Sequence, residues 1–212
     1  AIGTNRFAVT YCPLCGTCMV FSRNYRGQVV DFGVSGLLYK SDVLMYDRQT
    51  GSLWSQLKMQ AVTGPMKGQA LEWRPSEHLT FAAWREKYPG GTVLSTETGF
   101  NRSYGRTPYA GYERDQGVMF SVGKIRAGLK NKEWIIGLLA GDKAFALPVA
   151  GMPAKQPVVV GSGDAAVGVR YDPDSKAVSA IAVADGAAVP FVKAYWFAWQ
   201  AFHPDSLIVS PK

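Results

Sequence analysis

Three cysteines lie at positions 12, 15 and 18 in the stretch TYCPLCGTCMVF, and the 212-residue chain has no others. Thiolates bind soft and borderline metal ions, and closely spaced thiols also cycle between dithiol and disulfide. An odd number of cysteines leaves at least one thiol unpaired within a monomer. We therefore expect Cys12, Cys15 and Cys18 to form a metal site, a redox pair with a third thiol nearby, or one disulfide with a spare thiol.

A zinc site is the first alternative, because CPLCG has the C-P-x-C-G form of a zinc knuckle. A structural zinc ion takes four ligands, and the second knuckle that usually supplies two of them is absent. Cys18, His78 or His203 would complete the site. Packing or capping is the more common role for histidines placed like His78 and His203.

Copper is the second alternative, because three close thiolates suit Cu(I). Met19, Met45 and Met59 could add thioether ligands, although methionines are more often core residues. The expected cofactor is therefore copper or zinc.

A redox role is the third alternative, since glutaredoxin-like motifs also have the form C-P-x-C. Those motifs need a helix that begins at the first cysteine, whereas strand-like sequence follows here. This disfavours a thioredoxin fold and leaves a cycling thiol pair on another scaffold open. A ferredoxin run would need cysteine in place of Ser22, and a c-type haem would need histidine in place of Gly16, which excludes both.

A polar pair, Ser41 and Asp42, interrupts the apolar run LLYKSDVLMY. A hydrolase that uses Asp42 with Ser41 is a further alternative. Asp47 opens the segment DRQTG, and we interpret it as a turn-capping residue.

The segments that carry the cysteines and the Ser41–Asp42 pair are predicted to be strands. β-branched and aromatic residues predict strands over 7–12 and 18–34, with RNYRG as a polar turn, so the cysteines lie at a strand-turn-strand corner. Residues 37–56 predict another strand, a turn at DRQTG and a short strand that carries Trp54.

A helix is expected where the period changes, within residues 75–94. Phe81, Trp84 and Tyr88 fall at helical spacing, Ser76 and Thr80 are possible N-caps, and the helix should end at Pro89 before a strand.

The same pattern recurs over residues 190–209, where Trp196, Trp199 and His203 repeat the spacing. From this we infer an internal duplication. Residues 1–112 form the first repeat, with the cysteine corner and a loop rich in tyrosine and glycine; residues 113–212 form the second, without cysteines. The prediction is one compact α+β unit, predominantly antiparallel β, whose two repeated halves each end in a short helix bearing tryptophan.

The loop of residues 96–117 has no periodicity, and four tyrosines or phenylalanines lie among its glycines. A loop of this length is usually functional or covers a site. A surface strap packed by its own aromatic side chains is the alternative.

The charge pattern excludes some classes of partner. The net charge is +7, but the excess is spread along the chain, and the basic run at 124–132 has the character of a solvated loop. We expect no nucleic-acid partner. No apolar run approaches the roughly 18 residues of a membrane-spanning helix, and the first residues lack the pattern of a signal peptide.

Several segments, in order, resemble one family: VTYCPLCGT, FGVSGLLYKSDVLMYDRQTGSLWSQ, TGF, YGRTPY and WFAWQAFHPDS. They are similar to the motifs of a widespread bacterial family catalogued as domain of unknown function 3179, and the match covers most of the chain. The resemblance implies an exported, extracytoplasmic protein and no established reaction. The positions that it singles out are Tyr11, Cys12, Cys15, Gly16, Tyr39, Ser41, Asp42, Tyr46, Asp47, Trp54, Ser55 and Gln56.

Two features depart from the family pattern. Cys18 stands where such proteins often have a small apolar residue, so a three-thiol site would be peculiar to this chain. Family members also usually carry a hairpin similar to residues 134–149 before the cysteine strand, from which we expect an N-terminal piece to be missing.

Our leading hypothesis is an extracytoplasmic protein whose cysteine corner binds a metal or cycles as a thiol pair. The alternative is a non-enzymatic interaction module of a surface assembly, stapled by one disulfide and contacting a protein partner through an aromatic patch. The candidate residues fall into three groups: catalytic, Cys12, Cys15, Ser41 and Asp42; cofactor-binding, Tyr11, Tyr39 and Trp54; metal-ligating, Cys12, Cys15, Cys18 and His78.

Overall fold

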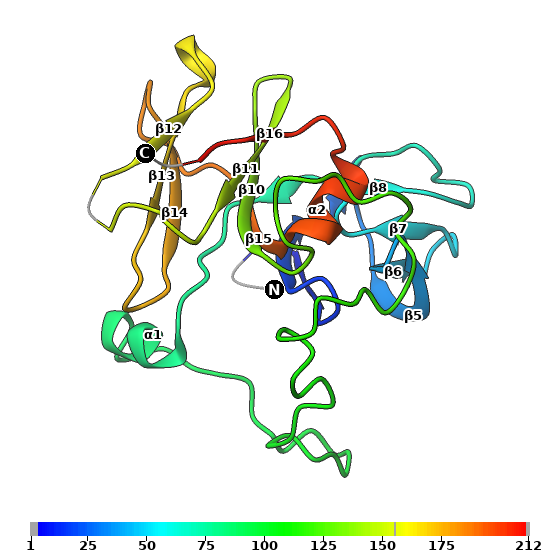
Figure 1. Cartoon of the computed structure of the whole chain (residues 1–212). Helices are drawn as coiled ribbons and strands as arrows, with labels where there is room; N and C mark the ends of the chain where they lie inside the picture. Colours follow the sequence, from blue (N-terminus) through cyan, green and yellow to red (C-terminus); the bar gives the residue numbers. More distant parts are fainter. Residues whose placement is uncertain (1–3, 155, 211–212) are drawn as a thin grey trace.

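A computed structural model describes residues 4–154 and 156–210 (Figure 1). Strands account for 36% of the structure and helices for 8%, which confirms a strand-rich chain. All strand pairs are antiparallel except the short parallel pair of β11 with β16. None of the described helices is long and apolar enough to cross a membrane.

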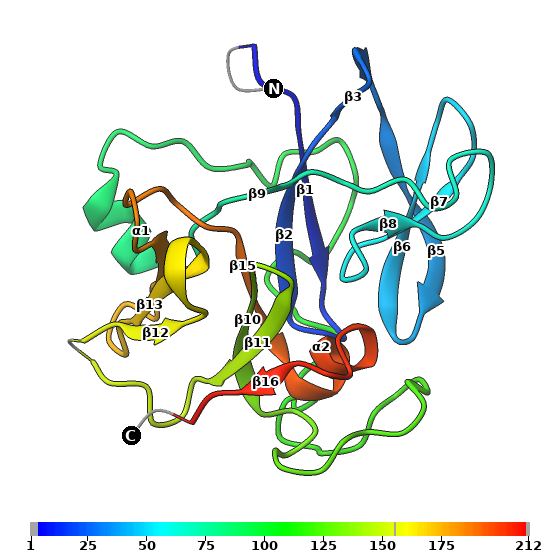
Figure 2. The same ribbon diagram turned by 90° about the horizontal axis from the view of Figure 1, so that it is seen from above.

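The cysteine corner is a hairpin. Strands β1 (Phe7–Cys12) and β2 (Thr17–Ser22) pair antiparallel, with Cys12 opposite Thr17, and β9 (Trp73–Arg74) pairs antiparallel with the other edge of β2. Side chains alternate between the two faces of a strand, so one face of β2 is buried and the other lies nearer solvent. The described structure thus confirms the expected strand-turn-strand corner. Figure 2 shows this hairpin between the two four-stranded sheets.

The first four-stranded sheet is a meander. It consists of β5 (Phe32–Tyr39), β6 (Asp42–Asp47), β7 (Leu53–Ser55) and β8 (Gln60–Ala61), in that order. The predicted strand over 18–34 is divided, because β3 (Asn24–Tyr25) and β4 (Gln28–Val29) form a separate two-stranded ribbon between β2 and β5.

The second four-stranded sheet separates two hydrophobic cores. Its strands, in spatial order, are β15 (Phe191–Tyr195), β10 (Trp134–Ala140), β11 (Lys143–Pro148) and β16 (Leu207–Ile208). Ile135 belongs to the core that contains the cysteines, whereas Ile136 belongs to a core beneath a third sheet. That third sheet comprises β12 (Val158–Val160), β13 (Val167–Tyr171) and β14 (Val178–Ala182), with the 3-10 helix η1 (Gly163–Ala165) between its first two strands.

The two predicted helices form, but in different surroundings. Helix α1 (Phe81–Lys87) is capped by Thr80, whose hydroxyl accepts from the Ala83 N–H at 3.3 Å, and it ends before Pro89 as expected. None of its residues is buried. Six of the seven residues of α2 (Trp196–Phe202) are buried. The internal repeat is therefore not confirmed, and α1 lies at the edge of the molecule in Figure 1.

Residues 88–133, between α1 and β10, form neither helix nor strand. The strand predicted after α1 is wrong: residues 92–94 are exposed and pair with no other segment of the described chain. In Figure 1 this green segment extends away from the sheets and then returns beside α2. The segment of residues 88–133 therefore packs, in its later part, against the core that contains the cysteines.

Candidate metal centre

The turn of the hairpin sets the spacing of the first two thiols. The Cys15 N–H donates to the Cys12 carbonyl at 3.2 Å, which closes the turn. Gly16 follows with φ of +68°, a conformation that glycine adopts without strain. A Cβ atom at this position would lie 2.4 Å from Cη2 of Trp134. Glycine at position 16 is therefore required by both the turn and the indole ring packed on it.

A second turn, between β5 and β6, lies against both thiols. The Ser41 carbonyl accepts from Cys15 Sγ at 3.3 Å and from Cys12 Sγ at 3.7 Å. Lys40 and Ser41 both have positive φ, as a two-residue turn between paired strands requires, although neither is glycine. The Ser41 hydroxyl donates to the Phe120 carbonyl, and Lys40 Nζ donates to the Ala201 carbonyl at 2.7 Å. These hydrogen bonds hold a strained turn in place.

Asp42 begins β6 directly after that turn and is completely buried. Its Oδ2 accepts from the Leu57 N–H at 2.9 Å and from the Ser55 hydroxyl at 3.3 Å. Its Oδ1 is buried without a hydrogen-bond partner in the described part of the chain. Burial raises the pKa of Asp42 well above its usual value, and the negative charge of a Cys12 thiolate raises it further.

Cys12, Cys15 and Asp42 together offer three ligand atoms within 4.8 Å of one another. All three side chains are buried. A hydrogen bond from the Cys15 thiol lowers the pKa of Cys12 to about 7, against the opposing effect of burial. That same hydrogen bond, with burial, raises the pKa of Cys15 well above the usual value. Of the two thiols, Cys12 is therefore the one that ionises at the lower pH.

A segment that we call the cover segment, residues 109–120, lies over this cluster. The Tyr112 ring lies 6.3 Å from the Tyr195 ring, centroid to centroid, and the Tyr195 N–H donates to the Cys15 carbonyl at 2.9 Å. Burial raises the pKa of Tyr112 to about 12, and the charges of Cys15 and Cys12 contribute. Buried Lys132 donates from Nζ to the Tyr112 carbonyl at 2.6 Å, and the same atom lies 3.3 Å from the centroid of the Tyr112 ring. Tyr109 and Tyr112 also pack on each other, with their ring centroids 6.3 Å apart, so both predictions for the long loop stay predictions.

A buried polar network fixes the hairpin to the meander. Gln56 accepts from the Thr17 hydroxyl at 2.6 Å and donates to the Thr10 hydroxyl at 2.7 Å. Thr17 and Tyr112 are site residues that the sequence reasoning missed. The position of Thr17 opposite Cys12 could have been found from the strand register, whereas no local signal marks Tyr112.

Two of the predicted metal ligands lie elsewhere. Cys18 follows Thr17, so its side chain points to the opposite face of β2, and it lines a groove there with Tyr11 and His78. The His78 ring packs 5.5 Å from Phe191, centroid to centroid, and burial lowers its pKa. The structure thus groups Cys12 and Cys15 with Asp42, and groups Cys18 with His78.

The remaining predicted residues have packing roles. Tyr39 packs against Phe202 at 5.7 Å between ring centroids. Trp54 is buried and donates to Asp47 Oδ2 at 2.8 Å; Asp47 also accepts from Thr50, which confirms that Asp47 caps its turn.

His203 also packs, stacked 4.0 Å from Trp199, and burial lowers its pKa to about 4. The expected packing role of His203 is confirmed.

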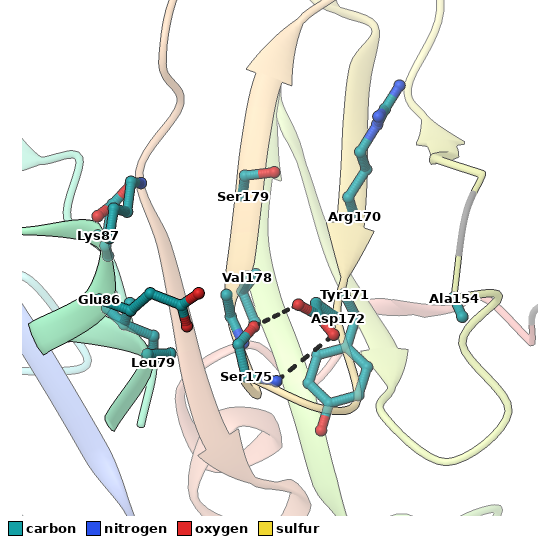
Figure 3. A pocket seen from close by; sticks show the side chains of 13 residues that line it. Leu79, Glu86, Lys87, Ala154, Arg170, Tyr171, Asp172, Ser175, Val178 and Ser179 are labelled. Carbon is teal, nitrogen blue, oxygen red and sulfur yellow. Dashed lines mark hydrogen bonds and ion pairs between the residues drawn. The ribbon is translucent and has the colours of Figure 1, made fainter. Parts of the chain in front are cut away.

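A groove beside α1 provides a contrast with the cysteine cluster (Figure 3). Its lining includes Glu86, Arg170 and Asp172 and contains no cysteine. The Asp172 carboxylate accepts from Ser175, drawn as dashed lines in the figure, so this exposed acid has its partners within its own turn. Asp42, in contrast, is buried with one oxygen unpaired.

Comparison with known proteins gives a family and no activity. The family model described as Protein of unknown function (DUF3179) matches residues 1–206, so the chain belongs to this family. No curated protein matches the chain, and no solved structure does.

Proposed function

We propose that this member of a family without an assigned activity is an extracytoplasmic metal-binding protein, and that Cys12, Cys15 and Asp42 bind one zinc ion. The observation that carries the proposal is the buried set of three ligand atoms within 4.8 Å, in which one carboxylate oxygen has no partner in the described chain. A buried unpaired carboxylate oxygen is costly, and a cation beside it removes that cost.

The donor set favours zinc over copper. Zinc accepts thiolate sulfur and carboxylate oxygen in one tetrahedral site, whereas Cu(I) prefers soft sulfur ligands alone. Cys18, the third thiol that a Cu(I) site would use, lies on the other face of β2. The carboxylate of Asp42 takes its place.

Three protein ligands leave one zinc position to fill. The Ser41 carbonyl already lies within hydrogen-bond reach of both thiols, and Tyr112 of the cover segment is close enough for its pKa to respond to them. The chain's own residues thus supply three ligands and exclude water from the site. Cys15 holds a proton that metal binding must displace. The metal would contribute a positive charge that keeps both thiols ionised.

In an extracytoplasmic location, a bound metal would determine whether the thiols stay reduced. Neighbouring free thiols are oxidised outside the cytoplasm, whereas thiolates bound to zinc are protected. Fractionation of cells that express the complete gene is the test of location, and recovery of the protein in the cytoplasm alone would contradict it.

Elemental analysis tests the metal assignment. Protein purified without added metal or chelator should contain close to one equivalent of zinc, and Cys12→Ser and Asp42→Asn should each lose it. Cys18→Ser is the matched control and should retain it. Equal zinc content in Cys12→Ser and in the unmodified protein would sink the proposal. Co²⁺ substitution adds a direct readout, because a thiolate-to-cobalt absorption band should appear in Cys18→Ser and vanish in Cys12→Ser.

A thiol redox function is the second candidate, favoured by the pKa of about 7 at Cys12 and the hydrogen bond from Cys15. In that reaction the Cys12 thiolate attacks a substrate disulfide, forms a mixed disulfide and releases one substrate thiolate, which takes a proton from water. Cys15, after giving its proton to the Asp42 carboxylate, then attacks Cys12 Sγ in the mixed disulfide and releases the second substrate thiolate, which takes the proton from Asp42. The pair is oxidised by two electrons and the substrate disulfide is reduced to two thiols.

One sample separates these functions. Bound zinc with both thiols reduced supports the metal site. Absence of metal, with a pair that a dithiol reagent reduces and a disulfide reagent reoxidises reversibly, supports redox cycling. Absence of metal with an irreducible disulfide would favour the interaction module with a stapled turn.

A further inference from the structure

A second site is suggested by a groove on the other face of the β1–β2 hairpin, which we call the outer groove. It lies between that hairpin, α1 and the β13–β14 turn, and has a volume of about 610 Å³. Small-molecule sites commonly have volumes of 300–1,000 Å³. The side chains that matter below are Tyr11, Phe81, Trp84, Trp134, Lys176 and Lys193.

One wall of the outer groove is aromatic. Phe81 and Trp84 of α1 stack with their ring centroids 5.8 Å apart and their planes at 13°, although no residue of α1 is buried. Phe81 is 59% exposed, and Tyr11 across the groove is 64% exposed. Aromatic side chains gathered in a groove and left facing water are typical of a binding site. A bound ligand would therefore explain why the aromatic side chains of α1 are exposed.

The other wall is cationic. Half-buried Lys193 places its Nζ 4.6 Å from the centroid of the Trp134 ring, and Lys176 lies nearby. Within the described part of the chain neither lysine forms an ion pair. Glu77, the acid that lines the groove, is engaged by Lys87 and by the Tyr88 hydroxyl. Burial and the charge of Lys176 lower the pKa of Lys193, and the charge of Glu113, which forms no ion pair with it in the described chain, opposes them only in part.

We propose that the outer groove binds a small anionic ligand with an aromatic or other flat apolar body. The carboxylate, sulfonate or phosphate group of the ligand would be held by Lys193 and Lys176, and its body would pack against Trp134, Tyr11 and the aromatic wall of α1. An anion supplies the missing counter-charge, and a flat ring covers the exposed aromatic surface.

This site is separate from the cysteine cluster, although the two share a wall. The Trp134 ring that floors the outer groove also packs on Gly16 of the cysteine turn. The ligand proposal does not depend on zinc, and metal content provides a check that a groove variant leaves the cluster intact.

Naphthalene-2-sulfonate is a suitable probe, because it joins one anionic group to a flat aromatic body. Isothermal titration calorimetry should show saturable binding to the full chain, and the uncharged analogue 2-naphthalenemethanol should bind about tenfold more weakly or worse. Lys193→Gln should weaken sulfonate binding by a similar factor. Lys143→Gln, a change at an exposed lysine on β11, is the matched control and should leave the affinity unchanged.

Phe81→Ser is the second variant, because it removes part of the aromatic wall from a helix that contributes nothing to the core. It should weaken both the sulfonate and the neutral analogue. Circular dichroism and zinc content should match those of the unmodified protein in all variants. Unsaturable binding, or equal affinity of Lys193→Gln and Lys143→Gln for the sulfonate, would overturn the proposal.

Discussion

The two faces of the β1–β2 hairpin carry the same chemical group in opposite settings. On the inner side, Cys12 and Cys15 are buried beside Asp42 and below the cover segment. On the outer side, Cys18 lines an open groove with Tyr11. A neighbouring thiol lowers the pKa of Cys12, whereas burial with no such partner raises the pKa of Cys18. Strand register, and not residue type, therefore assigns each thiol its chemistry.

The two faces also differ in the sign of the charged groups that lack a partner. The inner side concentrates groups that become anions and leaves one oxygen of Asp42 unpaired, so it suits a cation. The outer side presents Lys176 and Lys193 without acidic partners among the described residues, so it suits an anion. One hairpin thus separates two sites of opposite preference.

Gly16→Ala should destabilise the protein most, by about 3 kcal/mol. The new side chain would adopt an unfavourable left-handed conformation and would overlap Trp134, the residue that links the two faces. Gly27→Ala, at another positive φ but with open space around it, should cost only about 1 kcal/mol. Urea unfolding of the metal-free variants measures both, and equal costs would show that Trp134 does not constrain the cysteine turn.

Alkylation should distinguish the thiols by a factor on the order of one hundred, equivalent to about 2.7 kcal/mol. In metal-free protein at pH 8, iodoacetamide should modify Cys18 first. Cys12 should react slowly even though its pKa of about 7 makes it largely ionised, because it is 1% exposed. Mass spectrometry of peptides over time gives each rate.

The cover segment provides the control for that experiment. Tyr112→Ala should accelerate modification of Cys12 and Cys15 and leave the rate at Cys18 unchanged, since Tyr112 lies on the inner side. An equal acceleration at all three cysteines would indicate general loosening of the fold and would contradict a difference in accessibility between the two faces of the hairpin.

The sequence was sufficient for the hairpin, because β-branched and aromatic residues flank the cysteines on both sides. It was not sufficient for the turn at Lys40 and Ser41, because this polar interruption lies in an apolar run that reads as one strand. It also contained the signal for the position of Cys18: a strand that starts at Thr17 and buries Met19 must direct Cys18 the other way. The close spacing of the three cysteines in the sequence instead favoured a three-thiol site, which the separation of Cys18 from Cys12 and Cys15 does not support.

The two helices show what periodicity leaves open. Both have tryptophan at helical spacing and both form, yet α2 is buried and α1 is not. An aromatic stripe predicts an apolar face but does not identify what covers it. The route of residues 88–133 depends on long-range contacts such as Lys132 with Tyr112, and these leave no local pattern.

The two buried aspartates of β6 should respond to pH in opposite directions. Burial opposes ionisation of Asp47, but hydrogen bonds from Trp54 and Thr50 outweigh it and lower its pKa. Its contribution to stability is therefore present above the unfolded pKa, near 4, and is lost as the pH falls through the folded pKa. Asp47→Asn should destabilise the protein at pH 7 by about 1–2 kcal/mol.

Asp42 has a raised pKa, so its contribution is present below the unfolded pKa and is lost as the pH rises through the folded pKa. In metal-free protein, Asp42→Asn should reduce the loss of stability between pH 4 and pH 7, because it removes a buried group whose ionisation is unfavourable. Urea unfolding at pH 4 and pH 7 compares both variants. A loss of stability at pH 7 in metal-free Asp42→Asn would show that the carboxylate is needed for folding and is not held there for a ligand.

Cys18→Ala should have the smallest effect, below about 1 kcal/mol, because the side chain lines a groove and leaves no cavity when shortened. Zinc content and the Co²⁺ absorption band should be unchanged, since the ligand atoms lie on the inner side. Loss of the cobalt band in this variant would mean that the hairpin rearranges on metal binding and brings the third thiol inward. The two faces would then be states of one site, and the separation drawn from strand register would hold for the metal-free protein alone.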